Sequence, residues 1–452
     1  AAAEINDVTI TGGQINLGGF IRTDDGDGAG DVDLNGAVVL TAAVTIDTSA
    51  GEGTVDLSST LDGAFDFDIV SGAGSVVIQG TTGATTPLAS FDINESGGTG
   101  TIEVSSIGAA GAAGVTNATR FGNAATTDLT LDGTVYRTDG TQTYTAISTG
   151  DGILLKPAGA VAFTTSADDV SFLVGKVTLR GNTSVDTAAG AGTIRFGTAV
   201  DGAFNLTLTA GTGNIDFDAN VGSVTRLAAI DVVSAATLDT DGTFKAASFL
   251  QQAGTVLTRF DENLNLTGAF AFTGNALTLN AADTSVGTTM TVTNAGVFTT
   301  ADAANLTVGN EFVQNGAGNS VIGDDLSSTN DGFSFATNVT LTSTDALTIQ
   351  TGEAAGDDVV ITGTLTETNN PNLTIDAGEF GNITLTGAVN LGTGTLTIRD
   401  AAIVQVTSTL AAQAFTQTDG TTSTTIGNTA TIAGAFTFTG NALTLSGAGN
   451  TV

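Results

Sequence analysis

Carboxylates are the side chains of this chain that could do chemistry, and they are densest near the amino terminus. Residues 24–33 hold five aspartates among glycines and small residues, four of them being Asp25, Asp27, Asp31 and Asp33. Calcium takes six to eight oxygen ligands and suits alternating carboxylates on a flexible loop. The spacing therefore predicts a calcium site formed by these four residues, with a solvated acidic turn as the alternative.

The acidic loop matches neither of two common calcium motifs. An EF-hand loop would need a closing glutamate, which is missing, and the calcium-binding nonapeptide of repeat toxins requires an apolar residue two positions after the aspartate. Other acidic pairs, at Asp324-Asp325 with Asp331 and at Asp357-Asp358, are more typical of surface turns.

Catalysis has little support in the residue types. The chain has no His and no Cys, which removes the commonest general base and every thiol nucleophile. No Gly-x-Ser-x-Gly motif stands out. Paired carboxylates could serve a glycosidase, but among 46 acidic residues some pair falls at a suitable distance by chance. We expect a protein that is not an enzyme, with a β-helical polysaccharide-active enzyme as the weakest alternative.

The charge balance excludes several classes of partner. With 11 basic and 46 acidic residues the net charge is −35, and after Arg259 the one basic residue is Arg399. Binding to nucleic acid or to an anionic membrane surface requires clustered Lys and Arg. No apolar run approaches the ~18 residues of a membrane span, so no membrane insertion is expected. Copies of so acidic a chain repel one another unless cations such as Ca²⁺ or high salt screen the charge.

The elements that would position these groups are β-strands. The tripeptide Leu-Thr-(Leu/Ile/Val) places two apolar residues on one side of a strand and Thr on the other. It occurs eight times, beginning at Leu129, Leu206, Leu277, Leu306, Leu347, Leu373, Leu396 and Leu443. Gly, Asn and Asp fill the breaks between these segments, as in tight turns.

Two internal repeats show that the strand pattern is copied along the chain. Residues 268–279 return at 434–445, 166 positions later, with one difference in twelve. In the first half, Asp62-Gly63-Ala64-Phe65 returns as Asp201-Gly202-Ala203-Phe204, and flanking segments keep the same offset of 139. Both offsets are expected to span several smaller units, because a rung of a β-solenoid needs only ~20 residues.

The repeats favour an all-β parallel β-helix, a β-solenoid rod, over the alternative of tandem β-sandwich domains. Neither offset matches the size of an immunoglobulin-like sandwich, and the chain has no Trp for such a core. Three regions are predicted by the repeats: 1–155, 156–300, which copies part of the first, and 301–452. The 23 phenylalanines, including Phe65, Phe204, Phe270, Phe272, Phe436 and Phe438, are expected to stack in the core.

Strings such as Gly190-Ala191-Gly192-Thr193-Ile194-Arg195-Phe196 and Val200-Asp201-Gly202-Ala203-Phe204-Asn205-Leu206 resemble the repeats of large bacterial surface proteins. These are the filamentous-haemagglutinin-like and autotransporter-like β-strand-repeat exoproteins. The resemblance implies secretion, a location at the bacterial cell surface, a β-helix, and an adhesive, matrix or filament role. The composition, acidic and rich in Thr, Ala and Gly without Cys, also resembles that of S-layer proteins.

These observations lead to one functional hypothesis and one main alternative. Neither end of the strand pattern carries an obvious polar cap, and an uncapped solenoid end invites another copy to stack there. We therefore expect a secreted structural protein that self-assembles, head to tail or laterally, into an extracellular filament, sheath or S-layer. The alternative is the stalk of an adhesin, a segment of a giant exoprotein, with cell-surface glycans as possible ligands.

Overall fold

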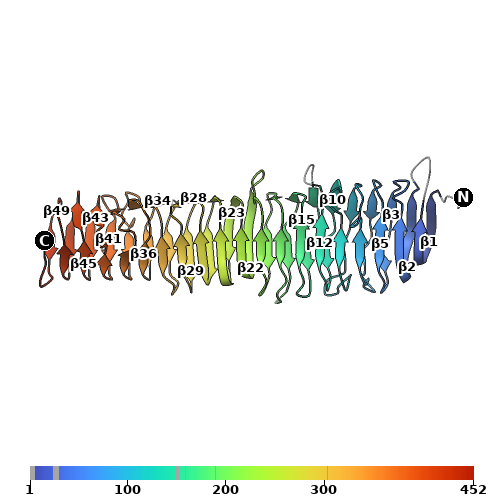
Figure 1. Cartoon of the computed structure of the whole chain (residues 1–452), viewed down its shortest axis with the longest axis horizontal. Coiled ribbons are helices and arrows are strands. Elements are labelled where there is room, and N and C mark those ends of the chain that lie inside the picture. Colours follow the sequence, from blue (N-terminus) through green and yellow to red (C-terminus); the bar gives the residue numbers. More distant parts are fainter. Residues whose placement is uncertain are drawn as a thin grey trace. The chain divides into compact units, whose positions relative to one another are not determined.

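The computed structural model describes residues 6–23, 30–147, 152–157, 159–188, 190–302 and 304–451. These residues form a β-solenoid of about 18 turns, with 52% of the chain in strands and no helix in the described part. Contacts divide the chain into an amino-terminal unit, Ala1–Ala236, and a carboxy-terminal unit, Thr237–Val452. Within each unit the strands of successive coils lie side by side (Figure 1).

A coil forms because short strands alternate with corners. In a strand such as Val55–Leu57 the two outer residues point inward and the middle one outward. Three such strands, each followed by a turn, close one coil, and the next coil repeats the path in parallel. Hydrogen bonds between neighbouring coils join residues 18 positions apart in the shortest case and 32 in the longest.

In the amino-terminal unit, β1 (Val8–Arg22) and β2 (Val32–Asp47) each run along all three faces of their coil. The first face continues through β3 (Val55–Leu57), β6 (Val76–Ile78), β8 (Ile102–Val104), β10 (Asp128–Leu131), β13 (Gly152–Leu155), β16 (Val177–Leu179) and β19 (Val200–Asp201). The second continues through β4 (Leu61–Asp62), β11 (Val135–Arg137), β14 (Val161–Thr164), β17 (Thr183–Asp186), β20 (Leu206–Thr209) and the start of β22 (Leu227–Thr240). The third continues through β5 (Phe67–Val70), β7 (Phe91–Ile93), β9 (Thr119–Phe121), β12 (Gln142–Thr145), β15 (Val170–Leu173), β18 (Ile194–Phe196) and β21 (Ile215–Phe217).

In the carboxy-terminal unit, β23 (Phe244–Gln251) begins the first and second faces and β24 (Gly254–Phe260) the third. The first face holds β25 (Leu264–Leu266), β28 (Asp283–Val286), β31 (Asn305–Val308), β34 (Leu326–Ser328), β37 (Leu347–Gln350), β40 (Leu373–Asp376), β43 (Thr395–Ile398), β46 (Ala414–Gln417) and β49 (Phe436–Phe438). The second holds β26 (Phe270–Gly274), β29 (Met290–Asn294), β32 (Phe312–Gln314), β35 (Phe333–Phe335), β38 (Val359–Ile361), β41 (Asn382–Leu385), β44 (Ile403–Val406), β47 (Ser423–Ile426) and β50 (Leu443–Leu445). The third holds β27 (Ala276–Leu279), β30 (Phe298–Thr300), β33 (Ser320–Ile322), β36 (Val339–Leu341), β39 (Leu365–Glu367), β42 (Val389–Asn390), β45 (Leu410–Ala412) and β48 (Ala430–Ile432).

Stacking in register turns the core into columns of like residues. On the first face of the amino-terminal unit one column consists of Val32, Val55, Val76, Ile102, Leu129, Ile153, Val177 and Val200. On the third face an aromatic ladder is formed by Phe67, Phe91, Phe121, Tyr144, Phe172, Phe196 and Phe217, with neighbouring ring centroids 4.9–5.8 Å apart. These rings are buried, so the ladder forms one continuous part of the apolar core of this unit.

The two sequence repeats are related by a rotation from one face to the next. Val55 lies on the first face of the amino-terminal unit, in β3, whereas its counterpart Ile194 lies on the third, in β18. In the carboxy-terminal unit Phe270 belongs to the second face and its counterpart Phe436 to the first. Each copy is therefore shifted by one strand with its turn, a third of a coil, so neither offset is a whole number of coils.

One corner of the amino-terminal unit is closed by a column of glycines. A Cβ built on Gly74 would lie 2.0 Å from the carbonyl oxygen of Gly53, and one built on Gly100 would lie 1.9 Å from that of Gly74. Beside this column, the Thr48 and Ser71 hydroxyls donate to the carbonyls of Gly53 and Gly74, each at 2.6 Å. Any side chain here would force successive coils apart.

The solenoid prediction is confirmed, and the alternative of tandem sandwiches is excluded because the strands pair in parallel. The Leu-Thr-(Leu/Ile/Val) prediction also holds: both apolar residues of each tripeptide are buried, except at Leu443 in the outermost coil. The three sequence regions are a division by repeats, which the contacts do not test. Core stacking is confirmed for Phe270, whose ring lies 5.0 Å from that of Phe249, and Phe272 is buried. The prediction is wrong for Phe65, which lies in a corner and is 39% exposed.

Candidate functional site: the open ends and the acidic clusters

The repeated dodecamer occurs in two coils of the carboxy-terminal unit that differ in burial. In the first copy Leu277 and Leu279 are buried between β24 and β30, with exposed fractions of 0% and 1%. In the second copy the matching Leu443 and Leu445 are 37% and 38% exposed, and among the described strands β50 pairs with β47. The same sequence is thus buried in one coil and open in another.

The phenylalanines of the dodecamer behave in the same way. Phe270 and Phe272 are 1% and 2% exposed, whereas Phe436 and Phe438 are half-buried. A coil that packs on β49 and β50 would complete this burial. Covering each leucine would contribute about 1 kcal/mol to the free energy of association, a third to a half of the value for full burial of the side chain. It would also pair the free backbone edge of β50.

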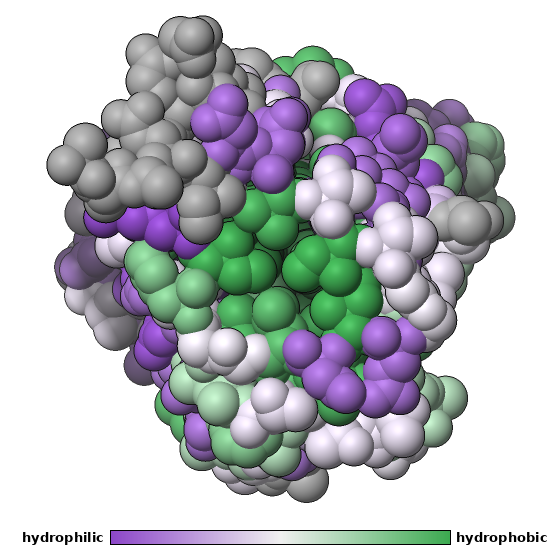
Figure 2. All heavy atoms as spheres, turned by 90° about the vertical axis from the view of Figure 1, so that its right-hand side faces the viewer, coloured by the Kyte–Doolittle hydropathy of each residue, from purple (hydrophilic) through white to green (hydrophobic). Residues whose placement is uncertain are grey.

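Apolar residues of β1 are likewise less buried than the residues they pair with. β1 pairs with β2 on one side, and Val8 and Ile10 are only half-buried although their partners Val32 and Leu34 are fully buried. Figure 2 shows this end face, where hydrophobic side chains gather at the centre and are ringed by hydrophilic ones. The described coils thus leave apolar side chains of β1 and β50 partly uncovered.

The predicted calcium residues fall partly outside the described part of the chain. Asp25 and Asp27 lie among the undescribed residues 24–29. Asp31 accepts a hydrogen bond from the Thr54 backbone N–H at 2.7 Å, and Asp33 points outward on β2, in register with Asp56. Calcium binding by the loop stays a prediction.

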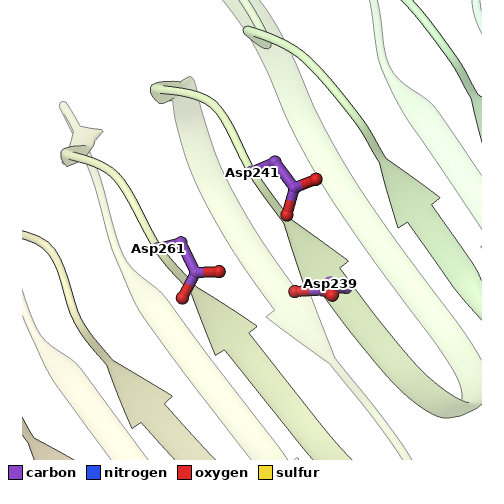
Figure 3. Close-up of side chains that lie close together, drawn as sticks. All are labelled: Asp239, Asp241 and Asp261. Carbon is purple, nitrogen blue, oxygen red and sulfur yellow. The ribbon is translucent and has the colours of Figure 1, made fainter.

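Among the described residues, one group of acids is compact enough to hold a metal ion, and the sequence alone does not predict it. Asp239, near the end of β22, Asp241, in the following turn, and Asp261, just after β24, bring carboxylate oxygens within 4.8 Å of one another (Figure 3). Arg259 donates to Asp239 at 2.7 and 2.9 Å and lies 3.2 Å from Asp261. The guanidinium is the cation of this cluster, which accounts for the three acids without a metal.

Arginines pair with acids on neighbouring coils in both units. Besides Arg259, the pairs are Arg22 with Asp47, Arg120 with Asp92 and Glu95, Arg195 with Asp218, and Arg399 with Asp376. Each pair reaches from one coil to the next, so the few basic residues offset acid repulsion along the stack. Because these arginines are exposed, each pair contributes at most about 1 kcal/mol.

Burial and acid repulsion raise the pKa of two carboxyl groups on the third face of the amino-terminal unit. Asp68 and Asp92 are register neighbours there, and Asp92 is in register with Arg120. Burial raises the pKa of Asp92 to about 6, although the Arg120 guanidinium, 3.4 Å away, acts to lower it. Burial likewise raises the pKa of Asp68, with added repulsion from Glu95 and Asp47.

Comparison with known proteins yields no relative from which a role could be taken. No protein-family model matches the chain, and neither a curated protein nor a solved structure matches it. Among the described residues, no helix is long and apolar enough to cross a membrane.

Proposed function

We propose that this chain is a structural protein whose solenoid continues from one copy into the next, as the building block of an extracellular filament, sheath or S-layer. The observation that carries the proposal is the parallel β-solenoid itself, because a coil of one copy can pair with a coil of another through the same strand hydrogen bonds and apolar columns that join coils within the chain. The strand β50 of one copy and β1 of a second copy are two elements that would pair in this way.

The charge of the chain favours end-to-end over lateral association. Copies that meet side by side bring the carboxylates of every coil together, whereas copies that meet end to end bring together those of the terminal coils alone. Lateral packing into a sheet would need cations such as Ca²⁺ between the acidic flanks. A filament at low ionic strength and a sheet with calcium are thus both within the proposal.

The proposed location is the bacterial cell surface. The β-solenoid is compatible with the filamentous-haemagglutinin-like and autotransporter-like proteins that the repeats resemble, and with the S-layer-like composition. The alternative, an adhesin stalk, predicts the same coils but no association between copies. No catalytic role is part of the proposal.

Sedimentation velocity over a range of concentrations tests the proposal, with Leu443→Glu as the variant. Wild type should form species larger than one chain as concentration rises, and the variant should stay monomeric because a carboxylate would be buried at the join. Thr444→Glu is the matched control, since Thr444 lies on the same strand between the two leucines, and it should assemble like wild type.

Two results would contradict the proposal. Monomeric wild type at every concentration, with and without calcium, would favour the adhesin stalk. Assembly that Leu443→Glu and Thr444→Glu affect equally would show that copies do not meet at the end face. Circular dichroism of both variants excludes misfolding as the cause.

A further inference from the structure

A hollow on the side of the amino-terminal unit is lined by charged and polar residues that have no role in end-to-end assembly. It measures about 250 Å³ and lies over β16, β19 and the turn that follows Val221. Its polar and charged lining comes from Lys176, Thr178, Arg180 and Asp201, and its apolar lining includes Phe204.

Two residues that line this hollow each carry a buried polar atom without a hydrogen bond. Asp201 is 4% exposed; its Oδ1 accepts hydrogen bonds from the backbone N–H groups of Val224 and Thr225, at 2.8 and 3.0 Å. Its Oδ2 is buried without a hydrogen bond, and so is the Oγ1 of Thr178, its register neighbour on the previous coil. A buried polar atom left without a partner costs about 1–3 kcal/mol, so a ligand that reaches both atoms would gain that energy.

The hollow also concentrates unpaired positive charge. Lys176 and Arg180 are two of the 11 basic residues in a chain of net charge −35. Unlike the five arginines that bridge coils, neither forms an ion pair within the described part of the chain. Two free cations beside one carboxylate favour a ligand that carries an acidic group.

The first copy of the repeat serves as an internal comparison. Asp62 matches Asp201, and its Oδ1 accepts from the Thr85 and Thr86 N–H groups at 2.8 and 3.0 Å, so the turn-capping role is common to both copies. The coil before Asp62, however, places Val39 where the coil before Asp201 places Thr178.

The flanking positions differ in the same way. The residues that match Lys176 and Arg180 in this register are Ala37 and Thr41, so the first copy has neither cation. Turn capping alone therefore does not account for the polar hollow at Asp201.

We propose that this hollow binds a negatively charged saccharide. Its acidic group would lie with Lys176 and Arg180, a ring hydroxyl would donate to Asp201 Oδ2, and Thr178 would bond a second hydroxyl. Phe204, half-buried, offers apolar surface to the sugar ring. A bare anion would be repelled by Asp201, and a metal cation by the two basic residues; a uronic acid combines an acid, hydroxyl donors and an apolar ring face.

This inference does not rest on end-to-end assembly, because the hollow lies on the side of the coils. Isothermal titration calorimetry of the full chain with oligosaccharides of galacturonic, glucuronic and mannuronic acid tests it. At least one should bind, and the neutral oligosaccharide of the same linkage should bind at least tenfold more weakly. The absence of binding by all three, or equal binding of the neutral sugar, would overturn the inference.

Variants locate the binding. Lys176→Gln and Arg180→Gln should each weaken binding about tenfold, and Arg195→Gln, which removes a basic residue on another face, should not. Asp201→Asn replaces the acceptor Oδ2 with a donor and should weaken binding, whereas Asp62→Asn makes the same change in the first copy and should leave it unchanged. Equal effects of the Asp201 and Asp62 variants would contradict the assignment.

Discussion

Replacing Asp92 with asparagine should stabilise the amino-terminal unit at neutral pH. The carboxyl is mostly buried on the third face, with a side chain 19% exposed, and burial raises its pKa from 3.8 to about 6. A raised pKa means that the folded state holds the proton more tightly than the unfolded state does. Asp92 therefore lowers the free energy of unfolding once it ionises, as pH rises through about 6.

The size of the effect follows from the pKa difference. About 2 pH units, at 1.36 kcal/mol each, give about 3 kcal/mol as the upper limit of the cost of ionised Asp92 at pH 8. Asparagine carries no charge but still leaves a polar group half-covered, so we expect Asp92→Asn to gain about 1–3 kcal/mol there. Below about pH 4, where Asp92 is protonated in both states, the gain should disappear.

Urea unfolding followed by tyrosine fluorescence measures this gain. The chain has no Trp, and both tyrosines, Tyr136 and Tyr144, are buried in the unit that holds Asp92. Subtracting the free energy of unfolding of wild type from that of the variant at each pH removes the general effect of the acidic surface, which both proteins share.

Arg120→Gln should change the free energy of unfolding in the opposite direction to Asp92→Asn. Removing the guanidinium leaves ionised Asp92 with less compensation, so this variant should lose about 1 kcal/mol at pH 8, and less in the Asp92→Asn background. A gain from Asp92→Asn that is the same at pH 4 and pH 8, or a loss at pH 8, would refute the reasoning.

Three further predictions concern the core. Gly74→Ala should lower the free energy of unfolding, measured by urea titration, by about 1–3 kcal/mol or more, because the added Cβ would clash with the Gly53 carbonyl. Gly97→Ala is the control: Gly97 has open space around it, so the free energy of unfolding should change by no more than about 0.5 kcal/mol. Phe172→Ala should cost about 3–5 kcal/mol, since it removes a buried ring from the middle of the aromatic ladder; a cost below 1 kcal/mol in urea unfolding would contradict the ladder. Burial raises the pKa of Tyr136 and of Tyr144 well above the usual value, so phenolate absorbance should stay low at about pH 11 in the folded protein and rise on addition of denaturant.

The coil could be predicted from the sequence because each strand carries its own pattern. In Leu129-Thr130-Leu131 the alternation alone determines which residues point inward, and glycine-rich breaks mark the corners. The position of a phenylalanine within this pattern matters more than its hydrophobicity. Phe65 lies in a corner, after Gly63 at φ 131°, and so faces outward, although the sequence suggests a core residue.

What lies side by side across coils could not be predicted, because coil length varies. The offset of 139 shows that Asp62 and Asp201 are copies, but it does not reveal that they lie on different faces. Nor does it show that Lys176 and Arg180 flank Asp201, since that depends on the length of one particular coil. The sequence suggests that acidic residues in turns bind cations. The carboxylates of Asp62 and Asp201 instead accept hydrogen bonds from backbone N–H groups.

Negative-stain electron microscopy of the purified chain, with calcium and then with chelator, tests the central claim most directly. If the open faces of β1 and β50 join, the images should show unbranched filaments longer than one chain, with chelator removing at most their lateral association into sheets. Single, separate particles in both conditions would contradict the claim that the solenoid continues from one copy into the next.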